Sequence, residues 1–130
     1  MQKNKIMTFL KYSFSICIIV FILNSCKKNQ VGGSGSVQGI VAHHEKPIGE
    51  AYVYIKYNTA EFPGDDYNVY DTYVKADASG HYSIPFYKGA YYIYARGYDY
   101  ALPAPYIVKG GLSVNVRNNE KLTKDIAVVE

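Results

Sequence analysis

The feature that most constrains this chain is an alternation of apolar residues with a period of two, which begins at Val37 and continues toward the C-terminus. Successive side chains of a β-strand point to opposite faces, so each alternating row predicts the buried face of one strand. Tyr, Val and Ile favour strands, and no helical period is sustained after residue 26. The expected core rows are Val37, Gly39 and Val41; Ala51, Val53, Ile55 and Tyr57; Tyr82, Ile84 and Phe86; Tyr91, Ile93 and Ala95; Leu112, Val114 and Val116; and Ile126 with Val128.

Short turn sequences separate these rows at near-regular spacing. They are rich in Gly, Pro, Asn, Asp and Ser, which are the residues that turns select. About six to eight short strands with such spacing predict an all-β sandwich. The expected turns are at residues 46–49, 77–80, 88–89, 110–111 and 118–119.

The N-terminal segment has the composition of an export signal. Three lysines precede an apolar stretch at residues 12–23, and the small and polar residues that follow end at Cys26. This order of basic, apolar and small residues is typical of a cleaved signal peptide. The sequence Leu23-Asn24-Ser25-Cys26 resembles the lipobox of bacterial lipoproteins. The resemblance implies a signal peptide at residues 1–25, cleavage before Cys26 and lipidation of Cys26.

Two other interpretations of this segment remain. A transmembrane anchor needs roughly 20 apolar residues, more than the stretch at residues 12–23 supplies. A plain signal peptide could be cleaved near Ser25 without any lipid. Stable anchoring by acyl chains needs more than one chain, which the lipoprotein modification provides on a single cysteine.

Removal of the leader changes the charge and the cysteine content. Three of the 14 basic residues lie within it, so the basic residues that remain balance the 11 acidic ones. A near-neutral chain gives no argument for nucleic-acid binding. Cys17 is removed as well, which leaves Cys26 as the single cysteine and excludes an intrachain disulfide. No cofactor is expected.

The rest of the chain divides into two parts. Residues 26–36 comprise the lipidated cysteine and a polar, Gly- and Ser-rich stretch that predicts a flexible tether. A flexible chain of this length has a root-mean-square span of roughly 17–19 Å. Residues 37–130 are enough for one domain.

Four segments in order resemble the carboxypeptidase regulatory-like domain, and the likeness is closest to small Bacteroidetes-type lipoproteins that carry this one domain. They are residues 37–41 (VQGIV), 47–53 (PIGEAYV), 75–84 (KADASGHYSI) and 89–95 (GAYYIYA). The resemblance implies a transthyretin-like (Greek-key) β-sandwich of seven or eight strands. It says little about function.

The same resemblance argues against an enzyme. Transthyretin-related hydrolases use histidines and a C-terminal Tyr-Arg-Gly-Ser tail, whereas this chain ends Ala127-Val128-Val129-Glu130. The zinc ligands of the carboxypeptidases lie in a separate catalytic domain. No Ser or Cys stands in a recognisable nucleophile motif, so we expect a non-enzymatic module.

Two clusters offer metal-ligand chemistry. Asp65, Asp66, Asn68 and Asp71 lie within residues 61–71, and oxygen ligands of this kind suit calcium. Their spacing matches no EF-hand loop, and an ordinary polar loop is the alternative. His43-His44-Glu45, with His81, is the second cluster, but we expect a solvated turn there because adjacent side chains diverge.

The tyrosines provide the main functional hypothesis. Tyr52 and Tyr54, and likewise Tyr92 and Tyr94, fall on the phase opposite to the core rows. If their strands are neighbours, these four rings and Arg96 form an outward patch, of a composition that suits protein interfaces and sugar stacking. The alternative is that these tyrosines only fill strand positions.

Three functions follow from these observations. The first is a membrane-anchored binding or assembly module for an envelope protein partner. The second is a carbohydrate-binding lipoprotein whose tyrosines stack on a glycan, and the third is a structural spacer. Lys27 and Lys28 follow Cys26 where surface-exported lipoproteins of this kind tend to carry acids, which favours the outer membrane and its periplasmic face.

Overall fold

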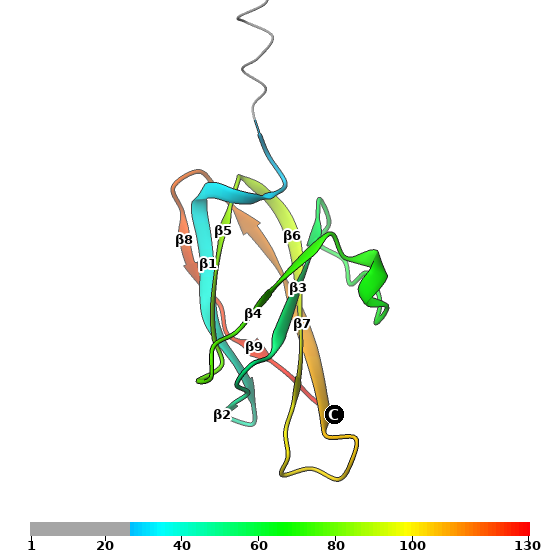
Figure 1. Ribbon diagram of the computed structural model, residues 1–130. Coiled ribbons are helices and arrows are strands. Elements are labelled where there is room, and N and C mark those ends of the chain that lie inside the picture. The colour runs from blue at the N-terminus through cyan, green and yellow to red at the C-terminus, as the bar shows by residue number, and fades with distance from the viewer. Residues whose placement is uncertain (1–26) are drawn as a thin grey trace, which may run out of the picture.

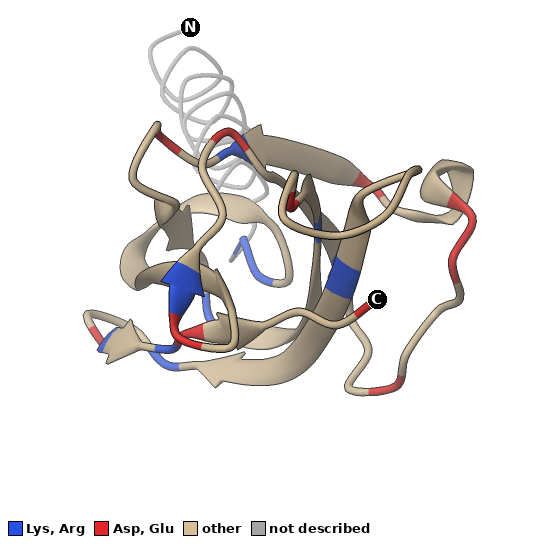
Figure 2. Cartoon of the chain, turned by 90° about the horizontal axis from the view of Figure 1, so that it is seen from below, with Lys and Arg blue, Asp and Glu red and all other residues tan. Residues whose placement is uncertain are grey.

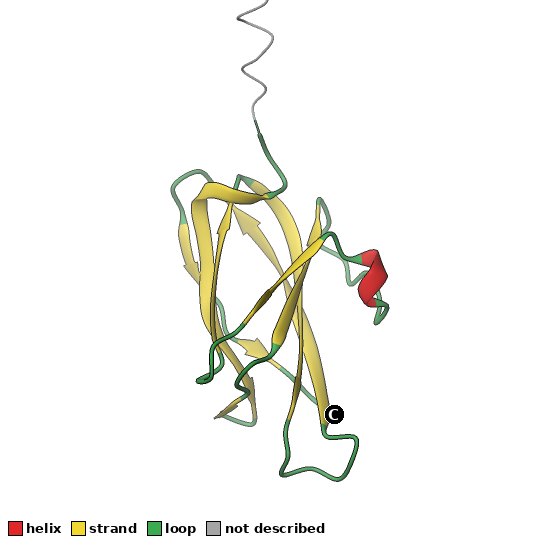
Figure 3. Ribbon diagram, in the orientation of Figure 1, coloured by secondary structure: helices red, strands yellow, loops and turns green. Residues whose placement is uncertain are grey.

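The computed structural model describes residues 27–130, which fold into two packed β-sheets (Figure 1). The proposed signal peptide at residues 1–25 and lipidation site at Cys26 lie outside the described residues. Strands form both layers, and a short 3-10 helix stands in the loop before β4 (Figure 3). The elements are β1 (Val31–His43), β2 (Lys46–Pro47), β3 (Tyr52–Tyr57), η1 (Tyr67–Val69), β4 (Thr72–Lys75), β5 (His81–Phe86), β6 (Gly89–Tyr98), β7 (Ile107–Val116), β8 (Lys121–Thr123) and β9 (Ile126–Ala127).

The first sheet is built around β1. Strand β5 pairs with it antiparallel, with Val37 opposite Ile84, and β2 pairs antiparallel with its C-terminal end. Strands β8 and β9 both pair parallel with β1, which makes this sheet mixed. The long first strand therefore holds together segments from both ends of the domain.

The second sheet has the order β4-β3-β6-β7 and is wholly antiparallel. Its longest pairing joins β6 to β7, from Gly89 opposite Val116 to Tyr98 opposite Ile107. The C-terminal segment then crosses to this sheet, because Val129 and Lys109 exchange two backbone hydrogen bonds of 2.9 and 2.8 Å. The chain end thus joins the two layers.

The core lies between the layers and is formed by the rows expected from the sequence. Alternation places one face of each strand inward, and the two inner faces pack against each other. Every apolar residue of those rows is buried except the half-buried Tyr57 and Leu112. The core also contains three residues that the expected rows did not include: Ile48, Ala76 and Val108. The predictions of an all-β architecture and of the residues that face the core are therefore confirmed.

The prediction that the Gly- and Ser-rich stretch is a flexible tether is wrong from Val31 onward. Strand β1 begins there, and Ser36 donates a 2.8 Å backbone hydrogen bond to Glu120. A Cβ at Gly33 would stand 2.3 Å from the Phe86 carbonyl oxygen, and one at Gly35 would stand 2.5 Å from Val116 Cγ1. These glycines permit close approach of backbones, which is a second use of the residue besides flexibility.

The Gly110-Gly111 pair predicted as a turn lies inside β7. A Cβ at Gly110 would meet the Ala127 carbonyl oxygen at 2.2 Å, and one at Gly111 would meet the Ile93 carbonyl oxygen at 2.5 Å. The missing side chains make room for the C-terminal segment and for β6. Both sheets and the core lie within residues 27–130.

No helix within residues 27–130 has the length and apolar character needed to cross a membrane.

Candidate functional site

The outer face of the second sheet carries the tyrosines singled out from the sequence. Strands β3 and β6 are neighbours, and their register places Tyr52 opposite Arg96, Tyr54 opposite Tyr94, and Lys56 opposite Tyr92. The alternate residues, such as Val53 and Ile93, point into the core. The strand pairing on which the patch depended is therefore present.

Tyr94 departs from the expectation, because it is only 3% exposed. Residues 58–71, which we name the covering segment, fold over it: the Phe62 and Tyr70 rings lie 5.4 and 5.7 Å from the Tyr94 ring. Tyr92 is half-buried beside the same Phe62 ring, at 5.7 Å. Tyr92 and Tyr94 therefore seat the covering segment and do not form the outermost surface.

Asp65 fastens the covering segment to the sheet. Its carboxylate accepts a hydrogen bond from the Tyr94 hydroxyl and another from Lys109 Nζ at 2.6 Å. The Lys109 bond, with that of Tyr94, holds the pKa of Asp65 below its usual value. Burial, reinforced by the bond to Asp65, raises the pKa of Tyr94. Tyr70 secures the segment internally by donating to the Gly64 carbonyl at 2.9 Å.

Of the four calcium candidates, Asp66 and Asn68 are bound to each other, but the three carboxylates are not grouped. Asp65 is bound as described, Asp66 caps η1 by accepting from the Asn68 amide at 2.9 Å, and Asp71 accepts from the Tyr57 amide at 2.7 Å. Lys56 Nζ lies 3.3 Å from Asp71 as well. Within residues 27–130 no three His, Cys, Asp or Glu side chains are grouped as a metal site would need. In the structure, these carboxylates stabilise the covering segment through their hydrogen bonds.

The exposed aromatic surface is larger than the predicted patch and extends beyond it. We name it the aromatic face; it comprises Tyr52, Tyr54, Tyr67, Tyr73, Arg96, Tyr98, Tyr100 and Tyr106. Its members follow one another with ring-centroid separations of 5.6 Å from Tyr73 to Tyr52, 6.3 Å from Tyr52 to Tyr54 and 4.9 Å from Tyr54 to Tyr67. Sequence alone did not reveal Tyr67 and Tyr73 as members, because their placement depends on how the covering segment and β4 return to the sheet.

Arg96 joins the two halves of the aromatic face. Its guanidinium carbon lies 5.1 Å from the centroid of Tyr67 and 5.5 Å from that of Tyr98. Tyr98 continues to Tyr100 at 6.3 Å, and Tyr100 to Tyr106 at 5.5 Å. Arg96 Nε is buried and has no hydrogen-bond partner within residues 27–130. This cation is thus held by aromatic rings.

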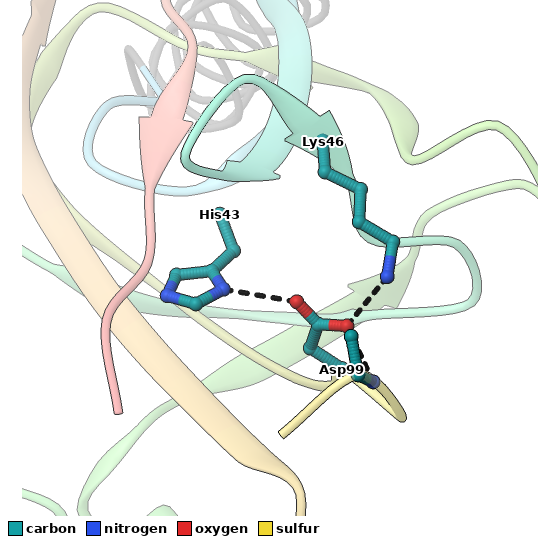
Figure 4. A network of polar contacts seen from close by, with 4 residues as sticks. His43, Lys46 and Asp99 are labelled. Atoms are coloured by element: carbon teal, nitrogen blue, oxygen red, sulfur yellow. Dashed lines mark hydrogen bonds and ion pairs between the residues drawn. The ribbon is translucent and has the colours of Figure 1, made fainter.

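The distal loop, residues 99–106, is held by a buried polar network (Figure 4). Asp99, only 4% exposed, lies 2.9 Å from His43 Nδ1 and accepts from Lys46 Nζ at 2.6 Å and from the Ala101 amide at 3.1 Å. The bonds from Lys46 and then His43 hold the pKa of Asp99 far below its usual range. In Figure 1 this yellow loop lies at the end of the domain opposite to the point where the chain enters.

The network corrects the expectation of a solvated turn at His43. His44 and Glu45 do form a turn, with φ of 46° and 66°, but His43 is buried at the end of β1. Its Nε2 has no hydrogen-bond partner within the described part of the chain. The histidine and Asp99 form an ordered pair, and this pair positions Tyr98, Tyr100 and Tyr106 through the loop.

Charges elsewhere are mixed. Figure 2 shows acidic residues spread over the loops around the sandwich, with basic residues among them. Lys75 pairs with Glu50 beside Tyr52, so the edge of the aromatic face carries a neutral ion pair.

Comparison with known proteins does not assign this chain to a family. A scan against family models finds no match to this chain, and a search of curated proteins finds none either.

Proposed function

We propose that this chain is a non-enzymatic lipoprotein of the bacterial cell envelope whose β-sandwich docks an envelope protein through the aromatic face. The lipid is attached at Cys26, and the domain lies on the periplasmic face of the outer membrane. The observation that carries the proposal is the continuous line of exposed and half-buried tyrosines from Tyr73 to Tyr106, with Arg96 at its centre.

The composition of this surface supports protein docking. Tyr and Arg, with Trp, are enriched at binding hot spots, and a Tyr side chain gives a large contact area while few torsions are immobilised. Tyr73 and Tyr100 are 59% and 77% exposed. Isolated exposed rings need no explanation, but a contiguous aromatic surface of this kind is typical of an interaction site.

A glycan site is the second candidate, and the structure favours it less. Stacking on sugar rings is usually combined with polar groups that bind hydroxyls. The carboxylates beside these rings, such as Glu50, Asp65 and Asp99, are already bound by protein donors. The guanidinium of Arg96, at the centre of the face, is a cationic donor that suits a carboxylate or carbonyl of a protein.

The fold we propose is transthyretin-like and related to the carboxypeptidase regulatory-like domain. Two facts support it: the four resembling segments fall on β1, the entry to β3, the β4–β5 turn and β6, and both sheets pack around one core. The non-enzymatic assignment is supported by His43 and Asp99. These two residues have side chains suited to catalysis, but their hydrogen bonds hold the distal loop in place.

The proposal is tested by quantitative recovery of envelope proteins with the native chain and with a Tyr52→Ala/Tyr73→Ala variant. Ile40→Ala is the matched control, because Ile40 is 38% exposed on the other sheet. We expect one stoichiometric partner that the control retains and the double variant loses by about tenfold or more. Equal recovery by all three proteins would contradict docking through this face, and retention on a polysaccharide matrix in its place would establish the glycan alternative.

A further inference from the structure

The end of the sandwich where the chain enters carries a basic pocket. The pocket has a volume of about 440 Å³ and opens broadly to solvent beside the start of β6 and the end of β7. Lys28, Lys88 and Arg117 are among the residues that line it, with Asn29, Asn115 and Asn118, and neither Asp nor Glu is among them. All three cations are exposed. Lysine and arginine side chains around one opening favour an anion.

The cations of this pocket are free to bind a ligand. Within residues 27–130 the ion pairs involve His43, Lys46, Lys56, Lys75 and Lys109, and none involves Lys28, Lys88 or Arg117. Glu120 is the nearby acid, and its carboxylate accepts from the Arg117 backbone amide at 2.8 Å. The pocket therefore keeps a net positive charge.

The entering chain is fixed to this end of the domain almost at once. The Asn29 amide donates to the Lys88 carbonyl at 3.0 Å, Asn29 Oδ1 accepts from the Ala90 amide at 3.2 Å, and the Tyr87 amide donates to the Gln30 carbonyl at 2.9 Å. Residue 26 is three positions before Asn29, so an extended chain separates them by about 10 Å at most. A group attached at residue 26 stays close to the pocket.

We propose that this basic pocket docks on the phosphates of anionic phospholipid headgroups and holds the domain upright against the membrane. The proposal rests on the lipid anchor of the proposed function, since a lipid on Cys26 would place the pocket within about a Debye length of the headgroups. Cationic side chains within that distance bind an anionic surface, and the effect is lost at high salt. The distal loop and its tyrosines then point away from the bilayer, toward a partner (Figure 1).

The test uses residues 27–130 without any lipid, because this part contains both sheets and the core. Sedimentation with vesicles of phosphatidylcholine alone is compared with vesicles that also contain phosphatidylglycerol. We expect binding only to the anionic vesicles, weakened about fivefold by Lys88→Gln and again by Arg117→Gln. Lys124→Gln is the control, because it removes the same charge from an exposed residue that does not line the pocket.

Three results would overturn the proposal: equal binding to both vesicles, equal losses with Lys124→Gln and Lys88→Gln, or complete competition by inorganic phosphate at constant ionic strength. The last result would show a site for the free anion. Failure of the anchor itself is scored separately, by fatty-acid labelling of the full chain and of Cys26→Ala. The two proposals can therefore fail independently.

Orientation has its own measurement, because residues 27–130 contain no cysteine. An environment-sensitive dye is placed on Asn118→Cys at the pocket and on Ala101→Cys in the distal loop. On anionic vesicles we expect the emission to shift to the blue at residue 118 only. A shift at residue 101, or none at residue 118, would contradict the upright orientation.

Discussion

The guanidinium carbon of Arg96 lies 5.1 Å from the centre of the Tyr67 ring, so a residue of β6 is stacked against the short helix that precedes β4. This contact links the sheet to the covering segment, and a second contact at 5.5 Å links the same cation to Tyr98. Arg96 is therefore both a structural fastener and the central charge of the surface that we propose for docking.

Replacement of Arg96 by Ala is expected to lower the free energy of unfolding by about 1 kcal/mol, because two partly exposed cation–π contacts are lost. Arg96→Lys keeps the charge but not the planar stacking. The free energy of unfolding of this variant should therefore lie between those of the native protein and of Arg96→Ala. Urea denaturation of the three proteins measures the effect. Identical midpoints and slopes for all three would contradict a role for this stacking.

Replacement of Tyr94 by Phe is expected to loosen the covering segment. The buried ring stays, but Asp65 loses the hydroxyl donor and keeps only Lys109, so the segment is held less firmly. Limited proteolysis within residues 58–71 should accelerate. Tyr92→Phe is the control, since no hydrogen bond of the Tyr92 hydroxyl is found within residues 27–130; equal cleavage of the two variants would refute the fastening role of Asp65.

Acid is expected to release the distal loop through Asp99. The pKa of Asp99 is lowered in the fold, first by Lys46 and then by His43, so the folded state favours the carboxylate. Its contribution to stability is fully present above the unfolded pKa of about 4 and is lost as the pH falls below it toward the folded pKa.

The measurement is thermal unfolding of the native chain and of Asp99→Asn across the acid range. Asp99→Asn should be less stable at neutral pH, and the gap should close as the pH falls below about 4. A gap that stays constant with pH would show that the carboxylate charge contributes nothing.

Alanine at Gly33 or Gly35 is expected to destabilise the domain by about 1–3 kcal/mol, since the new Cβ would stand within 2.5 Å of β5 or β7 atoms. Ser36→Ala changes a neighbouring residue of the same strand and should be nearly neutral. Thermal melts distinguish the cases. If residues 31–36 were a flexible tether, all three variants would melt together.

Much of the sandwich could be predicted because alternation reports directly on burial. Val53, Ile55 and Ile93 are fully buried where the pattern placed them. Val108 belongs to the same row as Val114 but was missed, because Gly110-Gly111 has the composition of a turn. Composition cannot separate a glycine that bends the chain from one that lets another backbone approach. The same ambiguity made the first part of β1, residues 31–36, look like a tether.

The candidate site was predicted only in part for a related reason. Tyr94 has the correct phase for an outer face, but the covering segment buries it. His43 and Asp99 lie 56 positions apart and meet only because β1 and β6 end near each other. Local patterns show which face a side chain takes, whereas loops that return over a sheet leave no periodic signal.

The central claim, that the aromatic face docks a protein, is tested most directly by a photo-crosslinking amino acid placed at Tyr73 in growing cells. The same probe at Ile40, on the other sheet, is the reference position, and each is combined with Arg96→Ala. We predict one defined protein adduct at position 73, reduced about tenfold or more by Arg96→Ala, and none at position 40. Absence of an adduct at position 73, or equal yields at the two positions, would contradict the claim.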